Sequence, residues 1–420
     1  MKQAPRNIKT AAIVTVGDEL MTGLVVDTNA AAIARFLLRR GYRIAGKSSA
    51  GDALPAIIAS VRAAMRRADI VVVTGGLGPT HDDLTKEALR RLFKCGVKFN
   101  PAVLRQVQSF FTRMGKPMPK INRDYADIPA AAVAVRNMMG AAPGLFFQKR
   151  VLALPGVPHE TLYMLEHEAA KFIPHGGAHI AEKTFHTAGV GEVGLMAQMK
   201  ELKEARKVAD IAFLPGNGGV DIRLLARGNT PANAQALLKE AVALIYPAIK
   251  GNVWGMDGET IESAVGKLLR KWKKTLAVAE SCTGGGIGKK ITATPGSSDY
   301  FIGGIISYAN RVKEKMLGVP AAIIKEHGAV SSECAEAMAE GVRNRLGADY
   351  VLAVTGVAGP DGGTKEKPIG LVYVAIAAKG WVKVRRLNLA GSRETIRERA
   401  ANEALFFLRE ILSIRQKDKG

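Results

Sequence analysis

Residues 279–286 combine reactive hydroxyls with the backbone of a possible anion site. Ser281 and Thr283 stand between a short apolar run, residues 275–279, and a glycine triplet, residues 284–286. Where such a run opens into a helix, free amides and the positive end of the helix dipole face outward, so we expect phosphate to bind there. A tight turn made of small residues for packing explains the same letters equally well.

The spacing around this stretch excludes a P-loop. That motif needs a glycine five positions before its Gly-Lys pair, and a serine or threonine directly after the lysine. Here Thr283 holds the first position and Lys290 follows the Gly288-Lys289 pair. The glycine triplet does not follow the dinucleotide-binding pattern either.

Further along the chain stand groups suited to serine-based catalysis. Ser298, Tyr308 and Lys313 are close enough in sequence to share one loop–strand–helix unit, and Ser281 enters from the neighbouring strand end. A lysine held neutral, or a phenol, can take the proton of a serine hydroxyl. These motifs contain no histidine, which argues against a Ser-His-Asp triad. Cys282 precedes a helix, which would lower its thiol pKa, although a small buried residue is the better explanation.

A second group of candidate residues mixes glycine or proline with carboxylates, in loops at residues 17–20, 74–85 and 154–160. Glycines let a phosphate approach the backbone, and carboxylates can hold a hard divalent ion that bridges phosphates. Helix capping explains one aspartate but not the whole set. We interpret the loops as a nucleotide or pterin-phosphate site. Its candidate residues are Gly17, Asp18, Glu19, Thr74, Gly75, Gly76, Gly78, Pro79, Thr80, Pro155 and Gly156, with Asp82 and Asp83 as metal ligands.

The elements around these loops indicate an α/β fold. Apolar runs at residues 11–16 and 70–74 are typical of strands, and residues 27–40 and 54–67 of helices. Repeated βαβ units predict a doubly wound parallel sheet. Ligands in such sheets bind at the carboxyl ends of the strands, which is where the three loops fall.

Two more regions follow the first. Residues 181–253 predict a small α/β unit with a hairpin over residues 215–219. Residues 216–219 have the letters of a nucleic-acid-binding GXXG loop, but that loop joins two helices, whereas this one joins two strands. We therefore expect a structural, dimer or hinge element. Alternating strands and helices from residue 258 to a last helix, residues 393–414, predict a third α/β domain.

Composition narrows the class of protein. The chain has 420 residues, enough for two or three domains, and a formal charge of +22. No apolar run approaches the roughly 20 residues that span a bilayer. The three widely spaced cysteines offer no disulfide framework, so we expect a cytoplasmic protein. The basic residues are spread over helices without a tail or interleaved aromatics, so we expect at most nonspecific nucleic-acid binding.

Residues 11–170 resemble the molybdopterin-binding-like domain. Thr74-Gly-Gly-Leu-Gly-Pro-Thr-His-Asp-Asp-Leu-Thr85, together with Pro155-Gly-Val-Pro158, is similar to the version in the competence-damage-inducible protein A (CinA) family. The resemblance implies an ADP-ribose pyrophosphatase that depends on a divalent ion (Mg, Mn or Co) rather than molybdenum cofactor synthesis. It also implies a homodimer and a KH-like middle segment.

Residues 258–415 closely resemble the C-terminal domain of the same family, which is similar to bacterial nicotinamide mononucleotide deamidase. The matching stretches are Glu280–Gly285, Pro295–Ser298, Ser307–Asn310 with Lys313, Gly328–Ser331 and Thr355–Gly363. The resemblance implies hydrolysis of the nicotinamide carboxamide to nicotinic acid mononucleotide and ammonia, without a cofactor.

The resemblance also implies roles for individual residues. Ser281, Ser298, Tyr308, Lys313 and Arg393 match functional positions of the deamidases. We favour Ser298 as nucleophile, Lys313 as base, Tyr308 as its assistant and Ser281 as the group that positions the amide. The substrate-binding candidates are Thr283, Gly284, Gly285, Asn310, Thr355, Gly356 and Arg393, among which Gly284, Gly285, Thr355 and Gly356 would supply backbone donors.

The expected organisation is therefore an N-terminal doubly wound molybdopterin-binding-like domain (residues 1–175), a KH-like connecting domain (176–255) and a C-terminal α/β deamidase domain (256–420). Two alternatives stay open. The basic charge and the KH-like unit suit a non-catalytic nucleic-acid or competence-associated adaptor, and the first domain suits a molybdopterin carrier.

Overall fold

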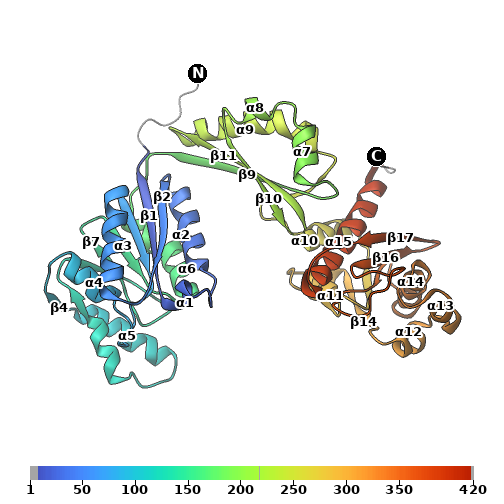
Figure 1. Ribbon diagram of the computed structural model, residues 1–420, viewed down its shortest axis with the longest axis horizontal. Coiled ribbons are helices and arrows are strands. Elements are labelled where there is room, and N and C mark those ends of the chain that lie inside the picture. The colour runs from blue at the N-terminus through green and yellow to red at the C-terminus, as the bar shows by residue number, and fades with distance from the viewer. Residues whose placement is uncertain (1–7, 217, 418–420) are drawn as a thin grey trace. The chain divides into compact units, whose positions relative to one another are not determined.

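The computed structural model describes residues 8–216 and 218–417. The chain divides into two compact units: residues 1–181 with 226–239, and residues 182–225 with 240–420. Both have the mixed α/β structure that the sequence predicts (Figure 1). In the described part of the chain, no helix is both long and apolar enough to cross a bilayer.

A six-stranded sheet forms the centre of the N-terminal domain, with strand order β2-β1-β3-β8-β7-β6. Four neighbours run parallel, namely β2 (Arg43–Ala50), β1 (Thr10–Val16), β3 (Ile70–Thr74) and β8 (Val151–Leu154). The other two, β7 (Gly144–Phe147) and β6 (Ala132–Val135), are antiparallel. The chain between β7 and β8 is only residues 148–150, too short for the crossover that a parallel pair needs. The sheet is therefore mixed at that edge.

Alternation along the strands decides which helix packs where. Ala12, Val14 and Val16 of β1 join the core formed with α3 (Leu54–Arg67), α4 (Thr85–Leu92) and α5 (Pro101–Arg113). Ala11 and Ile13 face the other way, toward α2 (Thr28–Arg39) and α6 (Pro158–His167). Figure 1 shows α3 and α2 on opposite sides of β1. Because both faces of the sheet are covered, its ends are left for ligands.

Shorter elements complete this domain. The helix α1 (Asp18–Met21) follows β1 directly, and a two-stranded antiparallel pair is formed by β4 (Val97–Phe99) and β5 (Asp127–Pro129). The helix α5 lies in the chain between these two strands.

The middle segment contains a four-stranded sheet of order β10-β11-β9-β12. Its elements are β9 (His179–Thr187), α7 (Glu192–Gln198), α8 (Leu202–Ala205), β10 (Asp210–Gly216), β11 (Gly219–Gly228), α9 (Pro231–Ile249) and β12 (Val253–Met256). The expected hairpin is confirmed, because β10 and β11 pair antiparallel up to Gly216 opposite Gly219. The GXXG letters therefore join strands; Asn217 itself lies outside the described residues.

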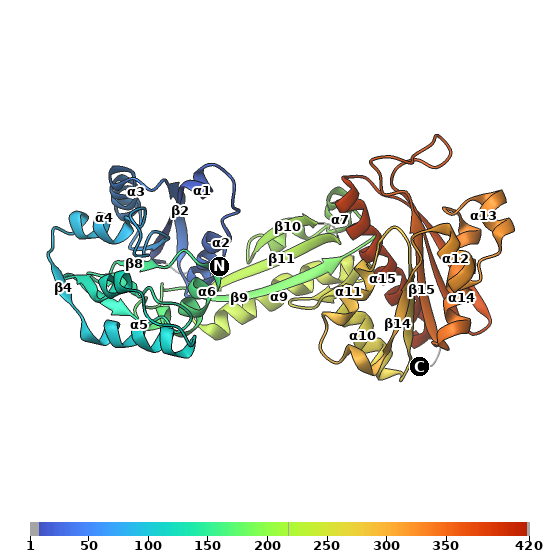
Figure 2. The same ribbon diagram turned by 90° about the horizontal axis from the view of Figure 1, so that it is seen from below.

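The C-terminal domain has a five-stranded sheet of order β14-β13-β15-β16-β17. The strands β14 (Phe301–Ile306), β13 (Leu276–Glu280) and β15 (Tyr350–Gly356) are parallel, and β16 (Leu371–Ala378) and β17 (Trp381–Asn388) continue antiparallel. One face packs on α10 (Ile261–Lys271), α11 (Gly286–Thr292) and α15 (Arg393–Lys417), and the other on α12 (Asn310–Leu317), α13 (Ala321–His327) and α14 (Ser332–Leu346). Figure 2 shows these two helical layers on either side of the sheet.

Candidate functional site

Three loops meet at the carboxyl edge of the C-terminal sheet. The Ser281 amide donates to the carbonyl oxygen of Val354 in β15 at 3.0 Å, and the Ser307 amide donates to that of Glu280 in β13 at 2.8 Å. These bonds extend the hydrogen-bonding pattern of the sheet by one residue beyond the ends of β13 and β14. They hold the residues after β13, β14 and β15 side by side, as expected for a binding edge.

Lys313 reaches this edge from α12. Its side chain is only 1% exposed, and its Nζ lies 3.1 Å from Ser281 Oγ. The same nitrogen donates to the carbonyl oxygens of Ser307 at 2.8 Å and Tyr308 at 3.2 Å. A carbonyl oxygen can only accept, so these two bonds use two N–H groups of the amine. The third contact is with the Ser281 hydroxyl, and through it the lone pair of a neutral Nζ can accept the hydroxyl proton.

The surroundings of Lys313 favour the neutral amine. Burial lowers the pKa of Lys313 from its ordinary value, and the nearby Cys334 and Cys282 thiols act in the opposite direction to a smaller extent. Each bonding partner of Nζ is a hydroxyl or a carbonyl, with no carboxylate to fix a positive charge. A desolvated lysine next to a serine hydroxyl is the arrangement of a general base with its nucleophile.

Ser298 does not join this pair, which corrects our preference for it as the partner of Lys313. It is exposed and lies in the short 3-10 turn Ser297–Asp299, just before β14 begins. In the parallel register, Phe301 at the start of β14 pairs with Leu276, and Ile306 at its end pairs with Glu280. Ser298 therefore precedes the amino end of β14, whereas Ser281 follows the carboxyl end of β13. The five residues from Leu276, the partner of Phe301, to Ser281 span about 16 Å at a strand rise of about 3.3 Å per residue.

The helix N-terminus after Ser281 is occupied by a carboxylate of the same chain. Glu280 is 1% exposed; its Oε2 accepts from the amides of Gly285 (2.9 Å) and Ile287 (3.1 Å), and its Oε1 accepts from that of Gly288 (2.8 Å). The Gly284 amide donates to the Ser281 carbonyl oxygen at 3.1 Å. Gly284 and Gly285 therefore have no amide left for a phosphate, contrary to expectation. The dipole and the amides stabilise Glu280 instead.

The loop between Glu280 and α11 is also fixed from α15. Arg397 donates from Nε to the Cys282 carbonyl oxygen at 3.1 Å and from Nη2 to that of Thr283 at 3.0 Å. Thr283 Oγ1 is buried without a hydrogen-bond partner among the described residues. Burial raises the pKa of the Cys282 thiol to about 12, so the expected lowering by the helix is wrong and the thiolate is not formed near neutral pH.

The other expected residues lie at the same edge with different exposure. Tyr308 is 58% exposed, and its hydroxyl accepts from Arg393 Nη2 at 2.7 Å, while Arg393 also donates to the Gly359 carbonyl oxygen. Asn310 is exposed at the start of α12. Thr355 is buried, and its Oγ1 donates to the Ala329 carbonyl oxygen at 2.7 Å. Gly356 ends β15. Sequence reasoning missed Arg397, since a lone arginine in an amphipathic helix carries no distinguishing pattern.

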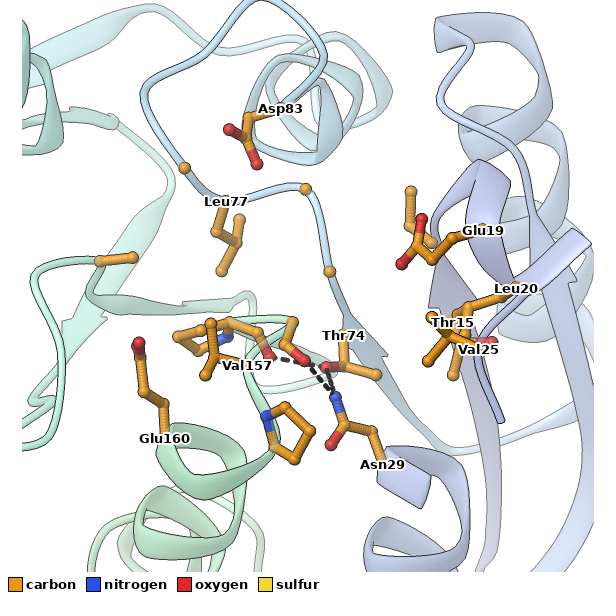
Figure 3. A pocket seen from close by; sticks show the side chains of 18 of the residues that line it. Thr15, Glu19, Leu20, Val25, Asn29, Thr74, Leu77, Asp83, Val157 and Glu160 are labelled. Atoms are coloured by element: carbon orange, nitrogen blue, oxygen red, sulfur yellow. Dashed lines mark hydrogen bonds between the residues drawn. The ribbon is translucent and has the colours of Figure 1, made fainter. Parts of the chain in front are cut away.

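The N-terminal domain has a cavity of about 560 Å³ at the carboxyl ends of β1, β3 and β8 (Figure 3). Eight of the expected nucleotide-site residues line it: Glu19, Thr74, Gly75, Gly76, Gly78, Asp83, Pro155 and Gly156. The remaining expected residues, Gly17, Asp18, Pro79, Thr80 and Asp82, are in the same loops but outside the lining. This volume is within the usual range for a small-molecule site.

Close packing requires a glycine at position 75, and at position 78 a glycine leaves space for a neighbouring side chain. Gly75 has a φ of 104°, and a Cβ there would lie 2.1 Å from the carbonyl oxygen of Val16. A Cβ on Gly78 would lie 2.2 Å from Asp83 Oδ2. The loop therefore brings β1 and β3 together and leaves room for the Asp83 carboxylate, which a side chain would displace.

Asn29, at the start of α2, was missed by sequence reasoning although it lines the cavity. Its Nδ2 donates to the Gly156 carbonyl oxygen at 2.6 Å and to Thr74 Oγ1 at 3.3 Å, as Figure 3 shows. Its Oδ1 is buried without a partner among the described residues. A buried acceptor left unpaired is costly, so a ligand donor at this point would stabilise it. The polar run Asp27–Asn29 after the first strand was the available signal.

Glu160, in the first turn of α6, ends the predicted 154–160 loop, although it was not among the individual residues predicted for the site. It lines the cavity, and its Oε2 accepts from Nδ2 of the fully buried Asn137 at 2.6 Å. Burial raises the pKa of Glu160, while the bond from Asn137 opposes that change to a smaller extent. Glu160 can therefore hold a proton at a higher pH than an exposed glutamate can.

The aspartates of the middle loop are the candidate ligands for a divalent ion. No group of three potential metal-ligating side chains occurs within residues 8–216 and 218–417. Asp83 Oδ2 accepts from the amide and the hydroxyl of Thr80, and neither aspartate caps α4, whose N-cap is Leu84. Asp82 is 69% exposed and lies 3.1 Å from His81 Nε2. The residues fit an ion held by one carboxylate and by phosphate oxygens, a mode usual for Mg²⁺, and not an all-protein cage.

Comparison with known proteins identifies the family. A CinA-like protein from Gemmatimonas aurantiaca is 42% identical over 410 residues, which cover 96% of each chain. The chain belongs to the CinA family. CinA-like proteins from Syntrophomonas wolfei (38% identical) and Synechocystis sp. (40% identical) likewise cover 96% of this chain and 99% of their own length.

Domain comparisons agree with this membership. Residues 258–412 match the CinA C-terminal domain, and residues 182–255 match the "Damage-inducible protein CinA KH domain". Residues 12–175 match the "Probable molybdopterin binding domain". In this CinA family chain, the Ser281–Lys313 pair therefore lies in the CinA C-terminal domain, and the 560 Å³ cavity lies in the molybdopterin-binding-like domain.

Proposed function

We propose that the C-terminal domain is a serine amidohydrolase that converts nicotinamide mononucleotide to nicotinic acid mononucleotide and ammonia. The observation that carries the proposal is the 3.1 Å contact between Ser281 Oγ and the buried Lys313 Nζ. This geometry supports the type of reaction. The resemblance of the surrounding motifs to the deamidases supports the substrate.

In the proposed first step, Ser281 Oγ attacks the carboxamide carbon while its proton passes to Lys313 Nζ. The resulting ammonium keeps its bonds to the Ser307 and Tyr308 carbonyl oxygens and gives a proton to the departing nitrogen, which leaves as ammonia. Lys313, neutral again, then takes a proton from the water that attacks the acyl-serine, and it returns this proton to Ser281 Oγ as the ester bond breaks. The unpaired Thr283 Oγ1 is our candidate donor to the oxyanion, because the Gly284 and Gly285 amides are already bonded.

The test is ammonia release from nicotinamide mononucleotide by the full chain, with and without a chelator. We expect chelator-resistant release that Ser281→Ala reduces by about 10³-fold. Ser298→Ala is the matched control, and we expect it to stay within a few-fold of wild type. Wild-type turnover in Ser281→Ala would overturn the assignment. No release from folded wild-type protein would instead favour the nucleic-acid or competence-associated adaptor.

We propose a second activity, pyrophosphate cleavage of ADP-ribose, for the N-terminal cavity. Its support is the combination of a glycine loop, the unpaired Asn29 Oδ1 and the protonatable Glu160 around one space of about 560 Å³. A divalent ion held by Asp83 would neutralise charge on the phosphates. Water would attack one phosphorus as the bridging P–O bond breaks, Glu160 would give its proton to the departing phosphate oxygen, and the proton released by the water would return to Glu160. A pterin that copurifies with the protein would favour the molybdopterin carrier instead.

This second activity is tested by ADP-ribose cleavage with Mg²⁺, Mn²⁺ or Co²⁺ present and after chelation. We expect a chelator to stop cleavage and Asn29→Ala to raise KM, because the unpaired acceptor is lost. Cleavage that resists chelation would remove the metal from the proposal.

We also propose that the chain forms a homodimer, which light scattering tests. We propose that it binds nucleic acid only nonspecifically, which binding measurements across salt concentrations test.

A further inference from the structure

A second cavity lies beside α5. Its volume is about 620 Å³, and it is lined by residues of α5, β4, β5, β6 and the chain after β6. Helix α5 contributes Arg105, Ser109 and Arg113, which recur every four residues, and Gln106, which is three residues before Ser109, so the four lie on one side of the helix. Phe110 of the same helix lines the first cavity, but the two cavities have no lining residue in common. The two spaces are therefore separate.

Basic side chains alone supply the charge of this second cavity. Lys98, Arg105, Arg113 and Arg136 line it, and no aspartate or glutamate is among its lining residues. The four cations come from β4, α5 and the chain after β6, which are distant in sequence. In a hollow lined by one sign of charge, the field is concentrated and ions of the opposite sign are attracted.

Hydrogen bonds fix some of these cations without neutralising them. Lys98 Nζ donates to the Ala130 carbonyl oxygen at 3.2 Å, and Arg113 Nη2 donates to that of Met138 at 2.9 Å. Gln106 Nε2 is buried and has no partner among the described residues. An unpaired donor inside a cationic hollow would gain a bond from an anionic ligand.

We propose that this cavity binds a small organic anion with two or more phosphates, such as a nucleoside di- or triphosphate. Arg105 and Arg136 bind the phosphates, and Gln106 Nε2 donates to one of their oxygens. The apolar wall around Val103, Ile128 and Met138 receives the organic part. The volume is in the range of small-molecule sites.

A nucleic-acid strand is the less favoured occupant. No aromatic residue lines the cavity, so it offers no platform on which bases could stack. A small phosphate compound needs only convergent cations and donors, which are present. The proposal does not depend on either proposed enzyme activity, because none of the lining residues belongs to those sites.

The test is calorimetric titration of the full chain with tripolyphosphate at physiological salt. We expect Arg105→Gln/Arg136→Gln to remove one binding event or weaken it by about tenfold or more. Arg35→Gln/Arg67→Gln, on α2 and α3, is the matched control, with the same loss of charge from exposed helix positions that do not line this cavity. Gln106→Leu should weaken the same event to a lesser degree. Circular dichroism and thermal unfolding establish that each variant is folded.

Three outcomes would overturn the proposal. The first is unchanged tripolyphosphate binding in Arg105→Gln/Arg136→Gln. The second is an equal loss in Arg35→Gln/Arg67→Gln, which would mean general attraction by the basic surface. The third is displacement of tripolyphosphate by a single-stranded oligonucleotide whose tighter binding depends on Arg105 and Arg136, which would make this face a nucleic-acid surface. Only binding events that remain after the Arg105→Gln/Arg136→Gln variant has lost one event are assigned to sites elsewhere, including the first cavity.

Discussion

At the carboxyl end of β13, amides of the glycine-rich loop donate to the Glu280 carboxylate, whereas at the carboxyl end of β3 the Gly75–Gly78 loop lines an open cavity of about 560 Å³. Both loops follow a buried strand and precede a helix. Both also lie at the edge of the sheet where ligands are expected. In the loop after β13, the Glu280 carboxylate occupies the position where an anion would bind. The loop after β3 leaves room for a ligand.

The reason for this difference is the side chain that ends each strand. β13 ends in Glu280, whose carboxylate is long enough to turn back onto the first turn of α11. β3 ends in Thr74, whose hydroxyl donates to the Pro155 carbonyl oxygen at 2.7 Å and so joins the neighbouring loop. In the C-terminal domain the proposed reactive groups are consequently the buried serine and lysine, with the glycine loop as their support. In the N-terminal domain the loop itself is the proposed binding surface.

The largest effect on ammonia release is expected from replacing Lys313, because the substitution removes the proposed general base. Lys313→Met keeps a long side chain that tolerates burial but has no proton acceptor. We expect ammonia release to fall by about 10³-fold or more, with little change in KM. Steady-state kinetics on the folded variant checks this. Lys315→Met, on the exposed part of the same helix, is the control and should behave as wild type.

The pH dependence of ammonia release sharpens the same point. Because burial lowers the pKa of Lys313, the neutral base should form at a lower pH than for an ordinary lysine. We expect kcat/KM to rise by about tenfold per pH unit until the pH passes the lowered pKa, and then to level off. A pH–rate profile gives the inflection. An inflection at or above the ordinary lysine value would contradict a neutral, buried base.

Glu280→Gln would disturb the glycine-rich loop after β13, whose amides donate to the Glu280 carboxylate. The amide still accepts through Oε1, but it loses the charge that the helix dipole favours and directs an NH₂ group at a backbone amide. We expect a loss of about 1–3 kcal/mol in the free energy of unfolding. Denaturant unfolding measures it, with Glu314→Gln on the exposed surface of α12 as control. Unchanged stability would show that the carboxylate is not needed at this helix end.

Replacing Asp82 should have the smallest effect on ADP-ribose cleavage, whereas replacing the adjacent Asp83 should have a large one. Asp83 lines the open cavity, while Asp82 is exposed outside it. Asp82→Asn should leave ADP-ribose cleavage within about twofold of wild type, and Asp83→Asn should lower it by at least about tenfold. Parallel assays at saturating metal compare the two. Equal losses would mean that the loop rearranges around bound metal.

Much of the fold could be predicted from local patterns. The alternating apolar strands, the helices between them and the hairpin at Gly216–Gly219 are encoded in short stretches, because burial on one face or two leaves a period in the sequence. The glycine- and proline-containing stretch at residues 140–148 also indicates a hairpin at the sheet edge, and the antiparallel pair β6 and β7 agrees with it. Their direction depends on the short connection at residues 148–150 and on which neighbour they pair with.

For the sites, the sequence by itself determined which residue types are present and at which strand ends they stand. Glu280–Gly285, Lys313 and the Thr74–Thr85 loop were identifiable because chemistry-bearing residues are grouped there with glycines. Only the tertiary structure decided the partners. The parallel register puts Ser281 beside Lys313 and leaves Ser298 at the far end of β14. Sequence spacing does not encode that choice, because strand pairing and helix packing set distances between residues independently of their separation in the chain.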